Sequence, residues 1–193
     1  MRDRAERFQP STVAEWREWL ADHHADRPEG VWLVKWRAGS GGPRLDHGEL
    51  VEQALCFGWI DSTGRALDAQ RTMVWFTRRR PGSGWSRLNK QRIARLTAAG
   101  EMAPAGLALV EAAQADGSWT LLDAVEDLAV PADLDAALAA TPPARERWDA
   151  LSRSARRAVL LEIAQARRPA TRARRVAEAA GRAAAAVSAR AHA

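Results

Sequence analysis

Asp61, Cys56 and His47 are the side chains of this sequence that could carry acid–base or nucleophilic chemistry. Asp61 ends a short segment that also holds Phe57 and Trp59. A carboxylate beside two aromatic rings loses solvation, which raises its pKa and suits it to proton transfer. We therefore take Asp61 as the candidate catalytic residue. The alternative is a structural carboxylate that accepts backbone N–H hydrogen bonds at a turn.

The single cysteine is expected to be a buried apolar residue. Cys56 lies on the apolar side of its expected helix, and free cysteine is usually buried. A nucleophilic thiol needs an activating base, and His47 is the one nearby candidate along the chain. The adjacent residues His23 and His24 point apart on a helix, and no further ligand spacing completes a metal site. We predict no metal and no cofactor.

The best binding candidate is a basic segment around Arg79 and Arg80. Guanidinium groups bind carboxylate or phosphate in a bidentate fork, and the unpaired N–H groups at the start of the following helix favour anions. The alternative is a solvated basic loop with Trp85 packed in the core. The predicted ligand-binding residues are Trp32, Lys35, Trp59, Asp61, Arg79, Arg80, Trp85, Ser86, Asn89 and Arg92.

Tryptophan is unusually frequent, with nine residues and no tyrosine. Trp32 and Trp36 share parity on an expected strand and so face one side of a sheet. If Trp59 and Trp75 share that side, the sheet presents an aromatic wall suited to a planar ligand. Core packing is the alternative for the same side chains.

The net charge of +5 conceals two basic blocks on either side of an acidic one. Residues 61–100 carry 9 basic and 2 acidic groups, residues 101–140 carry 8 acidic groups alone, and residues 141–182 carry 11 basic and 4 acidic groups. The blocks either neutralise one another across the fold or supply arginines to an anion site. Binding of nucleic acid is a further alternative. The sequence leaves open whether the C-terminal arginines bind a partner or only neutralise residues 101–140.

The elements that must position these residues predict an α+β fold: a small antiparallel sheet covered by helices, followed by a helical C-terminal subdomain. We expect an α+β domain over 8–128, the helical subdomain over 129–181 and a disordered tail over 182–193. The expected strands are 31–36, one that begins at Trp59, and a pair at 65–68 and 72–77. The expected helices are one from the cap Ser11 to about 23, then 47–57, 86–99, 104–115, 133–140, 143–165 with a break near Ser152, and 170–180.

The sequence also limits where the protein works. No window of 18 or more residues is continuously apolar, and the charged N-terminus is not followed by an apolar segment. We expect neither a membrane span nor a signal peptide, and a cytoplasmic location.

Three blocks of the sequence resemble the YdeI/OmpD-associated family, also called bacteriocin-protection proteins. The blocks are residues 54–62, 76–89 and 166–175, and the resemblance extends over about residues 8–180. It implies a soluble bacterial protein linked to stress tolerance, whose C-terminal helices form the family's OmdA domain. It implies no reaction. Arg78 stands where the family usually has proline, and the tyrosines of the family are missing.

The function predicted from these observations is binding of a small planar or anionic molecule in an aromatic-walled pocket with Arg and Asp polar groups. One alternative is a cofactor-independent enzyme that uses Asp61 as acid or base. Another is a nucleic-acid-binding module that uses the two arginine-rich blocks. The ligand, any catalysed reaction and the oligomeric state stay open.

Overall fold

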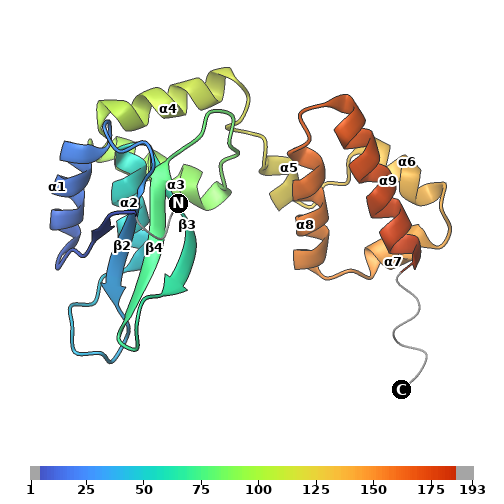
Figure 1. The fold of residues 1–193 in the computed structure, drawn as a ribbon. Coiled ribbons are helices and arrows are strands. Elements are labelled where there is room, and N and C mark those ends of the chain that lie inside the picture. The colour runs from blue at the N-terminus through green and yellow to red at the C-terminus, as the bar shows by residue number, and fades with distance from the viewer. Residues whose placement is uncertain (1–4, 186–193) are drawn as a thin grey trace. The chain divides into compact units, whose positions relative to one another are not determined.

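The computed structural model describes residues 5–185 and divides into two compact units (Figure 1). The described part of the first unit comprises residues 5–83 and 88–119. The second unit comprises residues 84–87 and 120–185. The predicted α+β class is confirmed, because the first unit holds the sheet and the second is helical.

The first unit is built on one four-stranded sheet in the order β1-β2-β4-β3. Strand β2 pairs antiparallel with β4, which pairs antiparallel with β3, while β1 joins β2 in parallel. The short parallel strand departs from the purely antiparallel sheet expected. The strands are β1 (Arg7–Phe8), β2 (Val31–Trp36), β3 (Trp59–Ala66) and β4 (Arg71–Arg78).

Four helices accompany the sheet: α1 (Val13–His23), α2 (His47–Cys56), α3 (Arg87–Ala98) and α4 (Pro104–Ala115). Figure 1 shows α1 and α2 side by side against the sheet, and α4 near the end of β4. The N-cap of α1 is Thr12, whose Oγ1 accepts a hydrogen bond from the Glu15 amide at 3.1 Å. The cap predicted at Ser11 is therefore one residue early, since the Thr-x-x-Glu spacing puts Glu15 at the N3 position.

The core of the first unit lies between these helices and one sheet face. Trp16 of α1 is fully buried, packs edge-on against Phe76 at 5.3 Å, and donates from Nε1 to the Leu50 carbonyl at 3.0 Å. Gly58 ends α2 with φ +75°, a conformation that favours glycine, as predicted from its place after the helix. The chain then turns directly into β3 at Trp59.

Strand β3 is continuous through a register shift between Asp61 and Gly64. The sequence predicted two shorter strands at this point, because the polar run Ser62-Thr63-Gly64 resembles a break. A bulge accommodates such a run without ending the strand.

The second unit packs five helices around its own apolar core. They are α5 (Asp123–Glu126), α6 (Ala132–Ala139), α7 (Ala144–Asp149), α8 (Arg153–Ala164) and α9 (Pro169–Ala185). Ser152 caps α8 by accepting from the Ala155 amide at 3.2 Å, at the break predicted there. Helix α9 buries Ala179, Ala180 and Ala183 and reaches residue 185, so the first residues of the tail expected from 182 are helical. Residues 186–193 lie outside the described residues.

Candidate functional site

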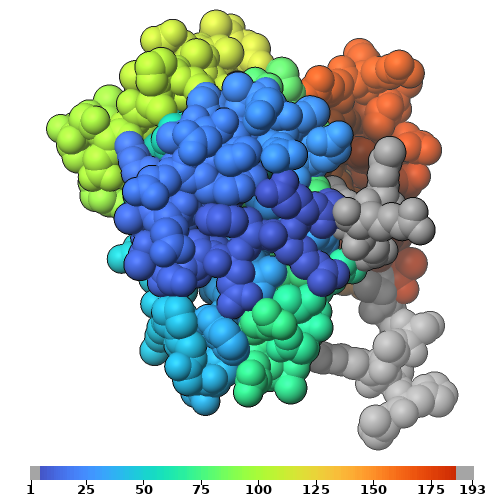
Figure 2. Space-filling view, turned by 60° about the vertical axis from the view of Figure 1, so that its left-hand side comes forward, coloured from blue at the N-terminus to red at the C-terminus, as the bar shows by residue number. Residues whose placement is uncertain are grey.

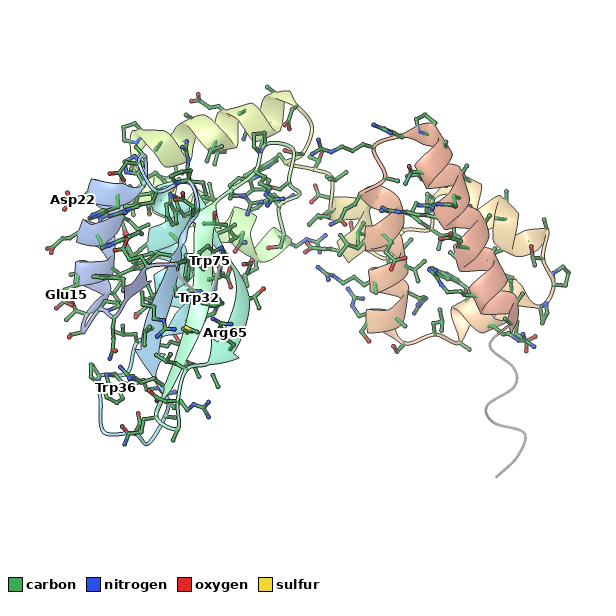
Figure 3. All side chains as sticks on the ribbon, in the orientation of Figure 1. Glu15, Asp22, Trp32, Trp36, Arg65 and Trp75 are labelled. Carbon is green, nitrogen blue, oxygen red and sulfur yellow. The ribbon has the colours of Figure 1, made fainter. Side chains whose placement is uncertain are left out.

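The tryptophans of the central strands lie on one face of the sheet. Register places Trp32 opposite Trp75, and their rings meet edge-on at 5.1 Å. The guanidinium of Arg65 lies 4.5 Å from the Trp32 ring centre, within the range of cation–π attraction (Figure 3). Both tryptophans are only 2 % exposed, and Trp36 is half-buried further along β2. This aromatic pair is packed rather than open.

Trp59 and Asp61 lie on the opposite face from this pair. Trp59 pairs with Arg78 and Asp61 with Phe76, whereas Trp75 points to the other side because side chains alternate along a strand. Trp59 is fully buried, meets Trp19 of α1 edge-on and donates from Nε1 to the His24 carbonyl at 3.1 Å. The expectation that Trp59 and Trp75 share a face is wrong, and no aromatic wall combines them.

Alternation also separates Lys35 from the tryptophans of its own strand. Lys35 lies between Val34 and Trp36 on β2 and is half-buried, on the face opposite Trp32 and Trp36. Lys35 and Trp32 therefore do not lie on the same face of the sheet.

Asp61 has a partner that sequence analysis did not assign to it. Its Oδ2 lies 3.0 Å from Nε2 of His47, the first residue of α2, and both side chains are partly exposed. A carboxylate in this position fixes the orientation of an imidazole ring. Fourteen residues separate the two in sequence, and only the return of β3 past the start of α2 brings them together. No spacing motif could have found this pair.

Cys56 is packed as the sequence predicted. The thiol is fully buried at the end of α2, and burial raises its pKa, with a smaller opposing effect from a hydrogen bond to Arg17. His47 contacts Asp61 instead of this thiol. A buried thiol with a raised pKa is a poor nucleophile.

The predicted site residues around the start of α3 are divided between the two units. Trp85 is 2 % exposed and belongs, with Ser86, to the second unit. The Arg87 amide donates to Glu126 Oε2 at 2.9 Å, so that a carboxylate already caps this helix. On the next turn Arg92 donates to Asn89 Oδ1 at 3.0 Å.

Arg92 also lies 3.6 Å from a carboxylate oxygen of Glu52 on α2. The charge of Arg92 is therefore balanced by a carboxylate of the same unit. The predicted convergence of Asp61, Arg79 and Trp85 on one cavity is not found among the described residues: Arg79 lines the cleft described next, and the other two do not.

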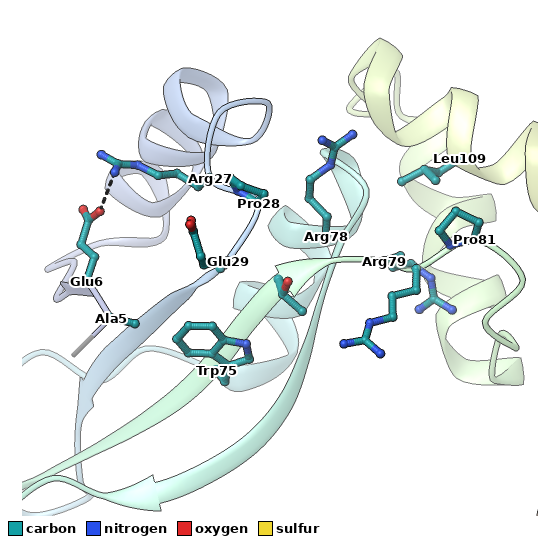
Figure 4. A pocket seen from close by; sticks show the side chains of 13 residues that line it. Ala5, Glu6, Arg27, Pro28, Glu29, Trp75, Arg78, Arg79, Pro81 and Leu109 are labelled. Atoms are coloured by element: carbon teal, nitrogen blue, oxygen red, sulfur yellow. Dashed lines mark ion pairs between the residues drawn. The ribbon is translucent and has the colours of Figure 1, made fainter. Parts of the chain in front are cut away.

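A cleft of about 890 Å³ lies in the first unit (Figure 4). Its described lining comes from the N-terminal segment at Glu6, the turn over residues 27–30 before β2, the end of β4 with Trp75 and Thr77, the segment 78–81, and Leu109 of α4. Figure 2 shows the N-terminal residues, dark blue, lying across the surface of this unit. Arg79 and Arg80 are the predicted site residues that line the cleft.

Gly30 allows the cleft to form at the start of β2. Its φ of +97° favours glycine, and a β-carbon here would lie 2.4 Å from the Phe76 carbonyl oxygen and 2.9 Å from Cζ2 of Trp75. Any larger residue would push the turn away from the Trp75 ring. Gly30 therefore allows the turn that carries Glu29 to lie close to Trp75.

The charges of the cleft fall into two groups. On one side, Glu6 and Arg27 form an ion pair at 3.4 Å, and Glu29 stands beside them (Figure 4). On the other side, Arg78 and Arg80 are exposed, and neither side chain makes an ion pair or a hydrogen bond within residues 5–185. Glu29 was not among the predicted site residues, because its approach to the cleft depends on the turn at Gly30. Arg78 belongs to the predicted basic segment, and Trp75 was predicted only as part of the aromatic wall.

Arg79 lies deeper in the same wall. It is 8 % exposed, and Nη2 donates to the Ser83 carbonyl at 3.5 Å. Burial lowers the pKa of Arg79 to about 10, which leaves the guanidinium cationic at neutral pH. The wall thus carries three positive charges on consecutive residues.

Two family models match the chain. Residues 8–109, more than half of it, match a family described as Domain of unknown function (DUF8412), and residues 127–186 match one described as Bacteriocin-protection, YdeI or OmpD-Associated (OmdA). The chain belongs to the DUF8412 family and carries a YdeI/OmpD-associated domain. No curated protein and no solved structure matches it. The resemblance to the YdeI/OmpD-associated family is confirmed over residues 127–186, which include the third sequence block and fall in the helical unit, whereas the first two blocks lie in the DUF8412 match.

The arginines of the OmdA unit contrast with those of the DUF8412 cleft. Arg172 of α9 binds Asp133 of α6 through two hydrogen bonds, of 2.7 and 3.0 Å. Arg145 bridges Asp135 and Asp149. These contacts confirm, for the pairs named, the interpretation that the C-terminal basic block neutralises the acidic segment before it.

Within residues 5–185, no group of three or more His, Cys, Asp or Glu side chains is placed to hold a metal ion. Over the same residues, every helix is too short or too polar to cross a membrane.

Proposed function

We propose that the DUF8412 unit binds a small molecule in the cleft beside Trp75, and that the ligand has an anionic group and a planar or apolar body. The observation that carries this proposal is the pair Arg78 and Arg80, two cleft arginines whose side chains have no ion-pair or hydrogen-bond partner among residues 5–185. A guanidinium without a carboxylate partner is ready to take a ligand carboxylate or phosphate in a bidentate fork.

The neighbours of this pair support a small ligand. Arg79 adds a third positive charge from within the wall, and Pro81 and Leu109 supply an apolar surface. The volume of about 890 Å³ falls within the range of small-molecule sites, about 300–1,000 Å³. A surface for nucleic acid would favour a longer basic track, whereas here Glu6 and Glu29 bound the same cleft.

The test is a titration followed by tryptophan emission, because Trp75 lines the cleft. The probes are two aromatic anions, indole-3-acetate and phenyl phosphate, compared with benzyl alcohol, which carries no charge. We expect the anions to bind at submillimolar concentration. The double variant Arg78→Ala/Arg80→Ala should lose at least about tenfold in affinity, since a charge-assisted hydrogen bond contributes about 1.5 kcal/mol.

The matched control is Arg44→Ala, because Arg44 is an exposed arginine of the same unit outside the cleft. It should bind like the wild type. Equal binding by the double variant and the wild type would remove the proposal, and so would tighter binding of benzyl alcohol than of the anions. A steep loss of DNA or RNA binding between about 50 and 200 mM salt would favour the nucleic-acid alternative instead.

A second candidate function is acid–base chemistry at the His47–Asp61 pair. The observation that favours it is the 3.0 Å contact between a partly exposed imidazole and a partly exposed carboxylate. In such a pair, Asp61 would orient His47, which would carry the proton.

Hydrolysis of p-nitrophenyl acetate and p-nitrophenyl phosphate tests the second candidate. Asp61→Asn should abolish turnover while the melting temperature stays nearly unchanged. A large loss of stability without a turnover effect would assign the pair a structural role.

A further inference from the structure

Glu29 adds a negative charge to the cleft, and a ligand with only an anionic group would not bind to it. Its carboxylate lies in the cleft lining, is exposed, and makes no ion pair or side-chain hydrogen bond among residues 5–185. Arg27, its neighbour in the turn, is engaged by Glu6 at 3.4 Å. On the acidic side of the cleft, the Glu6 carboxylate is therefore paired with Arg27, whereas the Glu29 carboxylate has no ion pair among residues 5–185.

Figure 4 places the two charge groups on different sides of the cleft, with Glu29 on the side of Arg27 and Arg78 on the side of Arg79. The Trp75 ring lies below Glu29 in this view, on the Glu29 side of the cleft. An anion held by Arg78 and Arg80 alone would leave Glu29 facing the rest of the ligand, and like charges in a partly closed site repel. A ligand that also carries a cation on its other end converts this repulsion into attraction.

We propose that the ligand of this cleft is a zwitterion, with its amine at Glu29 and its acid group at Arg78 and Arg80. The inference rests on the proposed function, because it assigns the second end of the same ligand.

The probe is the shortest peptide that carries a free amine and a free carboxylate on different residues, a dipeptide. Its backbone spans at most about 7 Å, and each charged side chain of the cleft reaches beyond its own backbone.

The experiment compares four forms of phenylalanyl-phenylalanine by isothermal titration calorimetry: the free zwitterion, the N-acetyl form, the C-terminal amide, and the form blocked at both ends. We expect the free dipeptide to bind most tightly. Each single block should weaken binding by about fivefold, the upper range for a solvent-exposed charge pair.

Two variants locate the two ends. Glu29→Gln should weaken the free dipeptide by about fivefold and leave the N-acetyl form unchanged, whereas Arg78→Ala should weaken the N-acetyl form and leave the C-terminal amide unchanged. The control is Glu18→Gln, because Glu18 is an exposed glutamate of α1 outside the cleft. It should bind every form like the wild type.

Equal binding of the free and N-acetyl dipeptides, with no effect of Glu29→Gln, would overturn the zwitterion and leave the anion site standing. Absence of binding by all four forms would also overturn it. In that case the separate titration with indole-3-acetate and phenyl phosphate decides whether the proposed anion site fails as well.

Discussion

The cleft arginines of the first unit and the C-terminal arginines of the second unit differ in their partners. In the OmdA unit, Arg172 and Arg145 each meet aspartates of neighbouring helices. In the DUF8412 unit, Arg78 and Arg80 line a cleft, and neither pairs with a carboxylate in the described part of the chain. Both regions appear as basic blocks in the sequence. A high density of arginine alone therefore does not indicate a binding site. A basic block is structural where its arginines pair with carboxylates, and is a candidate binding site where they do not.

The distribution of acidic residues explains the difference. Residues 61–100 hold two carboxylates against nine basic groups, so several arginines there have no acid nearby in sequence. The C-terminal block lies in one unit with most of the acidic segment, including Glu126, Asp133 and Asp135. Local packing then pairs the charges.

The largest expected effect compares the two cores. Trp16 and Trp148 are each at most 1 % exposed, one in each unit. Trp16→Ala and Trp148→Ala should each cost about 3–5 kcal/mol, through lost burial and the cavity that remains. Hydrogen exchange should show loss of protection in the substituted unit. Loss of protection spread equally over both units would contradict the description of two separate cores.

Substitution by phenylalanine compares the indole N–H groups of the same two tryptophans. Trp16 Nε1 donates to the Leu50 carbonyl, whereas Trp148 Nε1 is buried without a hydrogen-bond partner within residues 5–185. Trp→Phe removes the indole N–H in both cases. We expect Trp16→Phe to cost about 1 kcal/mol more than Trp148→Phe in urea unfolding, because only the first loses a hydrogen bond. Equal costs would show that the Trp16 bond contributes nothing.

A smaller effect tests the charge pairing of the OmdA unit. Arg172 holds the pKa of Asp133 below its usual value through their hydrogen bonds. A carboxylate with a lowered folded pKa adds stability above its unfolded pKa of about 4, and that stability is lost as the pH falls through the folded pKa. Arg172→Ala should therefore lower the free energy of unfolding by at most about 1 kcal/mol near neutral pH.

The difference between wild type and Arg172→Ala should shrink as the pH is lowered below about 4, in urea unfolding measured at successive pH values. The control is Arg174→Ala, since Arg174 lies 3.9 Å from Glu178 on an exposed helix face. It should change stability little at any pH. A difference for Arg172→Ala that persists at low pH would assign the effect to packing instead of the ion pair.

Residues that typically begin or end helices and strands made much of the fold predictable. Helix α4 has the predicted bounds, because Pro104 suits a first helical position and Asp116-Gly117 ends the helix. Strand β2 also has its predicted bounds, from a β-branched and aromatic run after the turn at Gly30. Strand β1 was missed, since two residues carry no periodicity.

The site was less predictable, because it depends on contacts between distant segments. The sequence identified Arg79 and Arg80 from a basic run, and both line the cleft. It could not give the register of β3 against β4, which puts Trp59 and Asp61 on the face opposite Trp75. Nor could it give the approach of Glu29, which depends on the turn at Gly30.

The most direct test of the central claim is the affinity of one aromatic anion, indole-3-acetate, for three forms of the chain. They are the wild type, the cleft double variant Arg78→Ala/Arg80→Ala, and Arg172→Ala from the paired block. We predict at least about tenfold weaker binding for the cleft variant and unchanged binding for Arg172→Ala. Unchanged binding for the cleft variant, or an equal loss in both variants, would contradict the claim that these two cleft arginines bind the ligand.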